Sequence, residues 1–183
     1  MIQSETGIFT RHTADTVYIR VNGRGAFPNS HPLRRYAANM IQRGKCQIVL
    51  DLEQCAGMDS TFLGVLTGIG LSLRQQNPPG AVHVINANRH SCDLLKSLWL
   101  DRLFRVYPEG VERPDFGEPA GGELQKLTDS DLSAGLHWLP HEETRELVLT
   151  AHQDLIRADS RNAPKFAEVT NQLGKEAQLR RPE

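Results

Sequence analysis

The chain has 183 residues, of which 39% are hydrophobic and 23% are charged, which is enough for one globular domain and an additional segment. Its formal net charge is −1, and Lys and Arg are interspersed with Asp and Glu, which argues against nucleic acid as the main partner. Residues 1–12 lack an apolar signal-peptide core, and residues 62–73 are too short and too rich in Gly and Thr to span a bilayer, so we expect a cytoplasmic protein without membrane insertion.

Residues 2–44 predict two strands followed by a helix. Residues 2–10 are weakly strand-like, residues 16–21 alternate as a half-buried strand does, and a hairpin at Ala14 and Asp15 would join the two. The sequence NGRG at 22–25 predicts a turn. A phosphate-binding loop is not expected there, because the third Gly, the following Lys and an immediately preceding buried parallel strand are missing. An amphipathic helix with Pro32 in its first turn is expected next, with one apolar face formed by Leu33, Tyr36, Ala37, Met40 and Ile41.

Residues 46–73 predict a short buried strand, a tight loop and an apolar helix. The strand is an aliphatic run that Asp51 interrupts. After the loop, Asp59 is placed to cap the helix N-terminus, and Ser60 falls at the first helical position. The helix is apolar nearly all round, so neighbours are expected on most sides. Gly64 and the glycines that follow it would let the helix lie close to a strand.

Two more strands are predicted over residues 82–85 and 103–107, the second at a sheet edge, with a short helix over 94–99 between them. The resulting order of elements is typical of an α/β protein with an antiparallel start and right-handed crossovers later. The same order also allows a small doubly wound sheet. Residues 108–123 contain three Pro, four Gly and five acidic residues against one basic residue, which predicts a linker.

The last segment, residues 124–183, predicts a helical hairpin. Pro140 can open a first helix, whose apolar stripe consists of Leu147, Val148, Ala151 and Leu155. A turn at 159–162 follows, with Asn162 as a cap and Pro164 in the first turn of a second helix. Two short helices rarely stand alone, so the stripes are expected to dock on the domain formed by residues 1–107, on a second copy or on another protein.

No catalytic or metal-binding pattern stands out. Residues 141–145 begin like a zinc-protease helix, but Arg145 stands where the second His ligand is required, and Pro140 interrupts the pair His137 and His141. Three cysteines without regular spacing favour free thiols over a disulfide framework. An enzyme built on Asp51 and a histidine would need a nucleophile and oxyanion donors that no pattern shows. We therefore expect no enzyme activity, cofactor or metal.

The strand and helix at the centre of the chain carry a resemblance to a known family. Asp51-Leu52 followed by Met58-Asp59-Ser60-Thr61-Phe62-Leu63-Gly64-Val65-Leu66 resembles the signature of STAS domains (sulfate transporter and anti-sigma factor antagonist), especially the single-domain bacterial antagonists. The resemblance covers residues 8–107. It implies a mixed β-sheet flanked by helices, which decides against the doubly wound alternative. Phe62 departs from the family pattern, since many relatives have a small residue there.

The resemblance also implies a function. It makes Ser60 a phosphoacceptor, Asp59 and Thr61 motif and capping residues, and Asp51 and Gly64 structural residues. The unmodified protein would bind an anti-sigma factor or a related serine kinase through the Ser60 end of the helix. Phosphorylation by the kinase with ATP would end this contact, and a phosphatase would restore it. This switch requires the Ser60 hydroxyl to be open at the front of the helix.

A second reading of the same residues remains open. A Ser at a helix start is commonly just a favourable first-turn residue. The protein would then be a non-switching STAS module of a signalling assembly or a lipid-transport complex, and the C-terminal helices would bind its partners. A homodimer is compatible with either reading.

Overall fold

The computed structural model describes residues 5–116, 124–128 and 141–178. Within these residues the sheet consists of β1 (Gly7–His12), β2 (Thr16–Gly25), β3 (Gln47–Asp51), β4 (Cys55–Met58), β5 (Ala81–Ala87), β6 (Arg105–Pro108) and β7 (Gln125–Lys126). The helices are α1 (Phe27–Gln42), α2 (Ser60–Arg74), α3 (Arg89–Ser97), α4 (His141–Ala158) and α5 (Ala163–Gln178), with 3₁₀ turns η1 (Leu100–Arg102) and η3 (Ser160–Asn162).

The sheet is mixed, as the resemblance implied. Its strand order is β6-β5-β3-β2-β1-β7, and β4 pairs with the end of β2 outside this path. Strands β1 and β2 form an antiparallel hairpin, whereas β2, β3, β5 and β6 pair in parallel. Each parallel step crosses over through α1, α2 or α3, so the predicted α/β architecture is confirmed.

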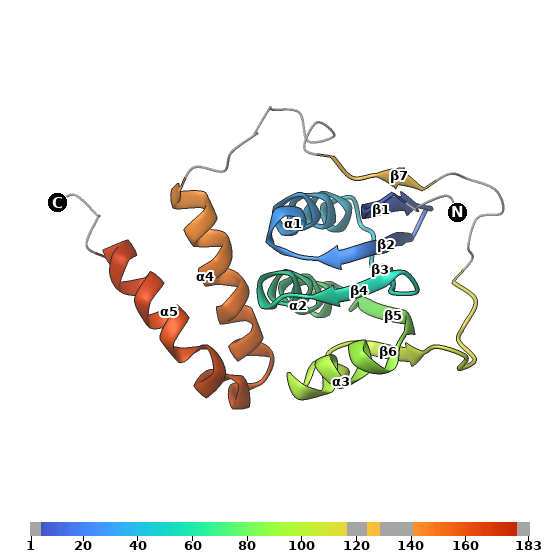
Figure 1. Cartoon of the computed structure of the whole chain (residues 1–183). Coiled ribbons are helices and arrows are strands. Elements are labelled where there is room, and N and C mark those ends of the chain that lie inside the picture. The colour runs from blue at the N-terminus through green and yellow to red at the C-terminus, as the bar shows by residue number, and fades with distance from the viewer. Residues whose placement is uncertain (1–4, 117–123, 129–140, 179–183) are drawn as a thin grey trace.

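Helices α1, α2 and α3 cover one face of the sheet (Figure 1). The strands present alternate residues to this face, and a single aliphatic core forms between them and the helices. Its largest fully buried side chains are Phe62, Ile8, Ile19, Leu33, Ile48, Leu50, Leu52, Leu63, Leu66, Leu73, Leu95 and Leu100. Burial of this apolar surface is the main force that fixes α2 in place.

Among the described residues, no helix lies on the opposite face of the sheet, here named the helix-free face (Figure 1). Tyr18, Val49 and Ile85 form a smaller cluster there, and Tyr107 and Phe116 pack against it. Phe116 belongs to the segment that follows β6, and its carbonyl oxygen accepts a hydrogen bond from the Tyr18 hydroxyl at 2.5 Å. Part of the segment expected to be a plain linker therefore contributes to the covering of this face.

The C-terminal helices form the predicted hairpin, and it docks in cis. Helix α4 packs across α2 and α5 lies outside it, so the order of layers is sheet, α1 and α2, then the hairpin (Figure 1). Three residues of α4, Leu147, Ala151 and Leu155, belong to the main core. Of the three docking modes left open by the sequence, the structure shows the one on the same chain.

Several predicted boundaries were wrong. Residues 22–25 are not a turn, because β2 continues to Gly25 by pairing with β4. Helix α1 begins at Phe27, well before Pro32, since the Asn29 side chain accepts the Ala26 N–H at 2.8 Å and starts the helix early. Helix α3 likewise begins at Arg89, because the preceding Asn88 caps it.

Candidate functional site

The N-terminus of α2 is held by one carboxylate. Asp59 precedes the helix, and its Oδ1 accepts the N–H of Phe62 at 2.8 Å. Its Oδ2 accepts the N–H of Phe27 at 2.8 Å, in the first turn of α1. Asp59 therefore satisfies a free amide at two helix starts and fixes the two N-termini side by side.

Gly25, at the end of β2, explains how the bulky Phe62 fits at this helix start. The Gly25 carbonyl accepts the Asp59 N–H at 2.9 Å, which brings the strand against the helix N-terminus. A Cβ atom at Gly25 would lie 2.5 Å from the Phe62 ring. The space that a side chain at 25 would need is thus filled by the ring at 62, which accounts for the departure from the family pattern.

Ser60 occupies the first position of α2, and its hydroxyl contacts the C-terminal hairpin. Its Oγ lies 2.9 Å from Nε2 of His152 on α4. Nδ1 of His152 lies 2.7 Å from the carbonyl oxygen of Val148, which can only accept, so Nδ1 carries the proton. In the neutral ring Nε2 is then the acceptor, and the Ser60 hydroxyl donates to it.

The surroundings of Ser60 differ from the expected open hydroxyl. Ser60 is half-buried, whereas His152 has only 5% of its surface exposed. The His152 ring also contacts Phe166 of α5, with 5.1 Å between ring centroids. The phosphoacceptor predicted from the sequence is therefore at the helix start as expected, but its oxygen is engaged by a buried histidine of the hairpin.

The next residues of α2 show why α4 approaches so closely. A Cβ atom at Gly64 would overlap the carbonyl of Ala151, and one at Gly68 would overlap the Asp154 carboxylate. The expectation that these glycines face a strand was wrong, because the Ala151 backbone and the Asp154 side chain that they accommodate belong to α4. Thr61, one residue after Ser60, is buried with 7% of its surface exposed.

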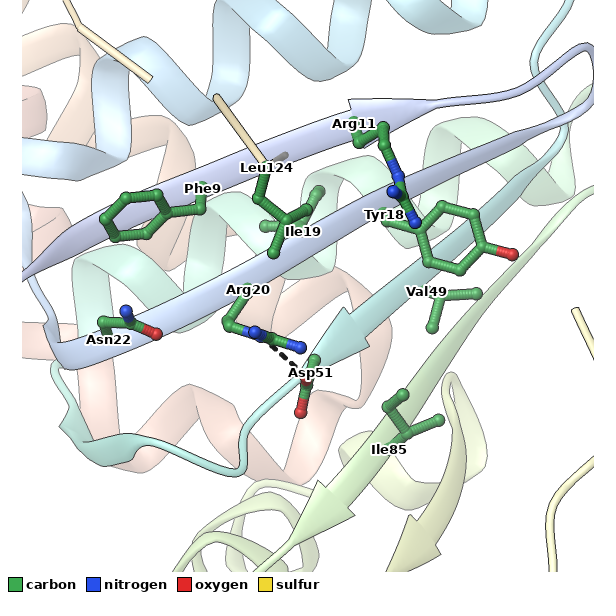
Figure 2. A pocket seen from close by; sticks show the side chains of 10 residues that line it. All are labelled: Phe9, Arg11, Tyr18, Ile19, Arg20, Asn22, Val49, Asp51, Ile85 and Leu124. Atoms are coloured by element: carbon green, nitrogen blue, oxygen red, sulfur yellow. Dashed lines mark hydrogen bonds and ion pairs between the residues drawn. The ribbon is translucent and has the colours of Figure 1, made fainter. Parts of the chain in front are cut away.

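Asp51 lies apart from this group, on the helix-free face of the sheet (Figure 2). Its Oδ2 pairs with Nε of Arg20 at 2.9 Å, and its Oδ1 accepts hydrogen bonds from the Asn86 side chain and the Glu53 N–H. Arg20 and Asp51 line a cavity of about 390 Å³ together with Phe9, Arg11, Tyr18, Ile19, Asn22, Val49, Ile85 and Leu124. The sequence motif thus separates in space, with Asp51 on one face of the sheet and Ser60 beyond the other.

A buried histidine lies on the same helix-free face. His83 has 3% of its surface exposed, and its Nε2 lies 2.9 Å from the side-chain oxygen of Gln47. The rings of Tyr107 and Phe116 contact it. Burial, and to a smaller extent the nearby Arg105, lowers the pKa of His83 to about 4. His83 is therefore neutral at physiological pH.

The other sequence candidates form no site in the described part of the chain. Its residues contain no group of three or more His, Cys, Asp or Glu side chains placed to hold a metal ion. His137 lies outside the described residues, and the three cysteines are free thiols. No helix among the described residues is long and apolar enough to cross a membrane.

Sequence reasoning missed His152, although it placed Val148, whose carbonyl oxygen His152 contacts, on the apolar stripe of this helix. A signal was present, because these two residues are four apart within the apolar stripe of α4. A histidine on such a stripe must find polar partners once the stripe is buried. That its partner is Ser60, 92 positions away, depends on how the hairpin docks.

Comparison with known proteins adds a family and related folds. The family model described as "STAS domain" matches residues 8–111. A Bacillus cell fate determinant, SpoIIAA in the phosphorylated form, is 20% identical, with a TM-score of 0.47 over 55% of this chain and 90% of that one. A putative anti-sigma factor antagonist from Thermotoga maritima is 23% identical, with a TM-score of 0.49 over 55% of this chain and 85% of that one. The NMR structure of this Thermotoga protein is 22% identical, with a TM-score of 0.50 over 59% of this chain and 86% of that one. Comparison with curated proteins gave no match.

Proposed function

The chain belongs to the STAS domain family, and on this premise we propose that it is a cytoplasmic regulatory domain, not an enzyme, that binds proteins and is switched by phosphorylation of Ser60. The observation that carries the proposal is the position of this hydroxyl. Ser60 is the first residue of α2, directly after the capping Asp59, and it lies outside the aliphatic core, at the contact between α2 and His152 of α4.

The physics of the helix start supports a switch that leaves the fold intact. A phosphoserine carries a charge of about −1.5 to −2, and a helix N-terminus favours negative charge by roughly 0.3–1 kcal/mol. The two hydrogen bonds of Asp59 to backbone amides do not involve the Ser60 hydroxyl, so we expect this cap to remain when Ser60 is modified. In a complementary protein interface the same charge would meet Asp59 and lose desolvated contacts, which costs about 2–5 kcal/mol. Modification would therefore spare the domain and weaken the complex.

The proposed cycle is partner switching of the anti-sigma factor antagonist type. The unmodified protein binds an anti-sigma factor or a related serine kinase through the Ser60 end of α2. The kinase transfers the γ-phosphoryl group of ATP to the Ser60 oxygen, ADP leaves, and the hydroxyl proton passes to a base. The phosphorylated protein dissociates, and a phosphatase hydrolyses the ester with water to restore the hydroxyl.

Incubation with the serine kinase of the same organism and ATP, followed by peptide mass spectrometry, tests the assignment. We expect one phosphate, on the peptide that contains Ser60, and none in the Ser60→Ala variant. Ser72→Ala is a matched control, since Ser72 is exposed on the same helix and its loss should change nothing. Equal phosphorylation of the Ser60→Ala protein would refute the proposal.

A second function is favoured by the exposed side of the hairpin. Residues 163–175 of α5 include no fully buried side chain, so this helix offers surface to a partner or to a second copy. The protein would then be a non-switching scaffold module. Pull-down with a Ser60→Asp variant and with an Ala167→Arg/Asn171→Arg variant, both exposed positions on α5, separates the functions. Loss of partners only in the second variant favours the scaffold, and loss only in the first favours the switch.

A further inference from the structure

The side of α2 that carries Ser60, Gly64 and Gly68, here named the serine-glycine face, is covered by α4. Between the described elements, α2 and α4 form the most extensive contact. Both glycines allow the α4 backbone or its Asp154 side chain to come closer than any Cβ would permit. At the N-terminal end of this face the Ser60 hydroxyl bonds His152. The phosphoacceptor and the surface beside it are thus occupied by the protein's own C-terminal segment.

We propose that α4 is an internal substitute for the protein partner on the serine-glycine face, and that the hairpin must leave before a partner or a kinase can reach Ser60. The inference rests on the proposed function for the identity of the site and adds its regulation. The hairpin makes the domain self-inhibited, and a partner binds by competing with α4.

The position of His152 opposes phosphorylation in the closed arrangement, because its imidazole occupies the space next to the Ser60 oxygen. In the neutral ring, the Ser60 hydroxyl donates a hydrogen bond to Nε2 of His152 across 2.9 Å. A phosphoester oxygen has no proton to donate, and the phosphate would need the volume that the imidazole now occupies. His152 is held from its other side by Val148, so the ring cannot turn away without losing that bond. Phosphorylation of Ser60 therefore requires an open hairpin and keeps it open afterwards.

The other anchors of the hairpin gather near its turn, where Lys165 also donates to the carbonyl oxygen of Ser97. Apart from the buried stripe of α4, the hairpin is held at its turn, where the fully buried Asn162 donates to the carbonyl oxygens of Leu98 and Leu155 at 2.9 and 3.0 Å. The Arg161 guanidinium lies 3.3 Å from the centre of the Trp99 ring. Asn162 was expected only as a helix cap, and it is instead a link between the hairpin and the end of α3. Helix α5 is not fully buried anywhere between residues 163 and 175.

The serine-glycine face determines which features a competing partner needs in order to replace α4. An occupant must bring an apolar helix that has a small residue where Ala151 meets Gly64, because a larger side chain would be kept away from the Gly64 backbone. It must also offer an acceptor to the Ser60 hydroxyl, as His152 does. A helix of an anti-sigma factor or kinase with these two features would fit in place of α4.

Alkylation of a thiol at position 60 tests the inference without any kinase. The parent is the full chain with Ser60→Cys, and the rate of iodoacetamide labelling of this peptide is followed by mass spectrometry, which separates it from the three native cysteines. Adding Ala151→Arg should displace α4 and raise the labelling rate at least tenfold. Gln153→Arg is the matched control, since Gln153 is exposed on the same helix, and it should leave the parental rate unchanged.

Equal labelling of the parent and the Ala151→Arg protein overturns the inference, whereas the phosphorylation assay above still decides the proposed function. Slow hydrogen exchange of β3 and β5 in the Ala151→Arg protein shows that the domain remains folded. If that variant loses this protection, Leu155→Asp replaces it, and the same tenfold increase is expected. Labelling rates that rise on dilution would show that a second copy supplies α4, which overturns the intramolecular mechanism.

Discussion

Helix α2 has two sides that are built from different residues. The side that faces the sheet carries large side chains such as Phe62, Leu66 and Leu73, all with at most 1% of their surface exposed. The side that faces α4 carries Ser60 and Gly64, which meet His152 and the Ala151 backbone. The inner contact depends on the burial of large apolar side chains, whereas the outer one combines the buried stripe of α4 with close backbone approach and one hydrogen bond.

This difference separates a permanent contact from a conditional one. Truncating the inner side chains of α2 leaves cavities in the core, because the surrounding side chains relax only in part and do not fill them. The outer contact adds three α4 residues to the core, whereas the sheet, α1 and α2 contribute most of it, so we expect these elements to stay folded when α4 leaves. A helix with these two sides can remain folded while its covering changes, which is what a switch at Ser60 requires.

The largest expected effect comes from the inner side. Phe62→Ala should lower the free energy of unfolding by about 3–5 kcal/mol, because the ring is fully buried and packs on Gly25. Urea denaturation followed by circular dichroism measures this. Phe166→Ala, the same truncation on the half-buried face of α5, is the control and should cost clearly less. Equal losses in the two variants would contradict the distinction between the two sides.

The next effect should come from a single methyl group on the outer side. Gly64→Ala places a Cβ atom against the Ala151 carbonyl, and we expect it to weaken hairpin docking by about 2–3 kcal/mol, the upper range for overpacking. Since Ala is about 1 kcal/mol better than Gly within a helix, α2 itself should not be destabilised. Hydrogen exchange should therefore rise across α4 and stay slow across β3. Gly174→Ala in α5, where no atom lies within 4 Å of the added Cβ, is the control and should not increase exchange in α4.

The stability of the fold should depend on pH through His83, which lies on the helix-free face of the sheet, away from both sides of α2. The pKa of His83 is about 4 in the folded protein and 6.5 in the unfolded chain. Between these values the unfolded chain binds the additional proton, so stability is full above pH 6.5 and falls as the pH is lowered toward 4. The loss should be about 2–3 kcal/mol. Its neighbours Gln47, Arg105, Tyr107 and Phe116 include no carboxylate to offset the charge.

His83→Gln should remove that part of the pH dependence. Denaturant midpoints at pH 7 and pH 4.5 for the two proteins measure the difference. If the variant loses as much stability on acidification as the native chain does, His83 is not the acid-sensitive element.

How much of this could be predicted from the sequence depends on the range of the interactions involved. The cap at Asp59 is a local pattern, and so is the helix that begins at Ser60, so the resemblance around residues 49–66 located both. Residues 22–25 were predicted as a turn because their composition is that of a turn. They are strand because β4, some 30 residues later, pairs with them. Tertiary pairing overrode the local preference.

The covering of Ser60 was beyond sequence reasoning for a related reason. The apolar stripe of α4 and the glycines of α2 were both recognised, but each pattern only states that something packs there. Which surfaces meet is decided by complementarity between Gly64 and the Ala151 backbone, and by the bond between Ser60 and His152. Single-chain patterns do not encode this match, because helical periodicity identifies a face and not its partner.

The smallest expected effect concerns the hydrogen bond itself. Ser60→Ala should weaken docking of the hairpin by about 1 kcal/mol, because it leaves the buried Nε2 of His152 without its donor. His152→Phe should have a similar cost, since Ser60 then loses its acceptor. Removing both partners together should cost less than the sum of the single changes, since no unpaired polar group remains. Hydrogen exchange of α4 in the four proteins gives this coupling directly. Additive losses would mean that the two side chains do not interact across the interface. Helix α4 would then be held by apolar packing alone, and its docking would not depend on whether Ser60 is phosphorylated.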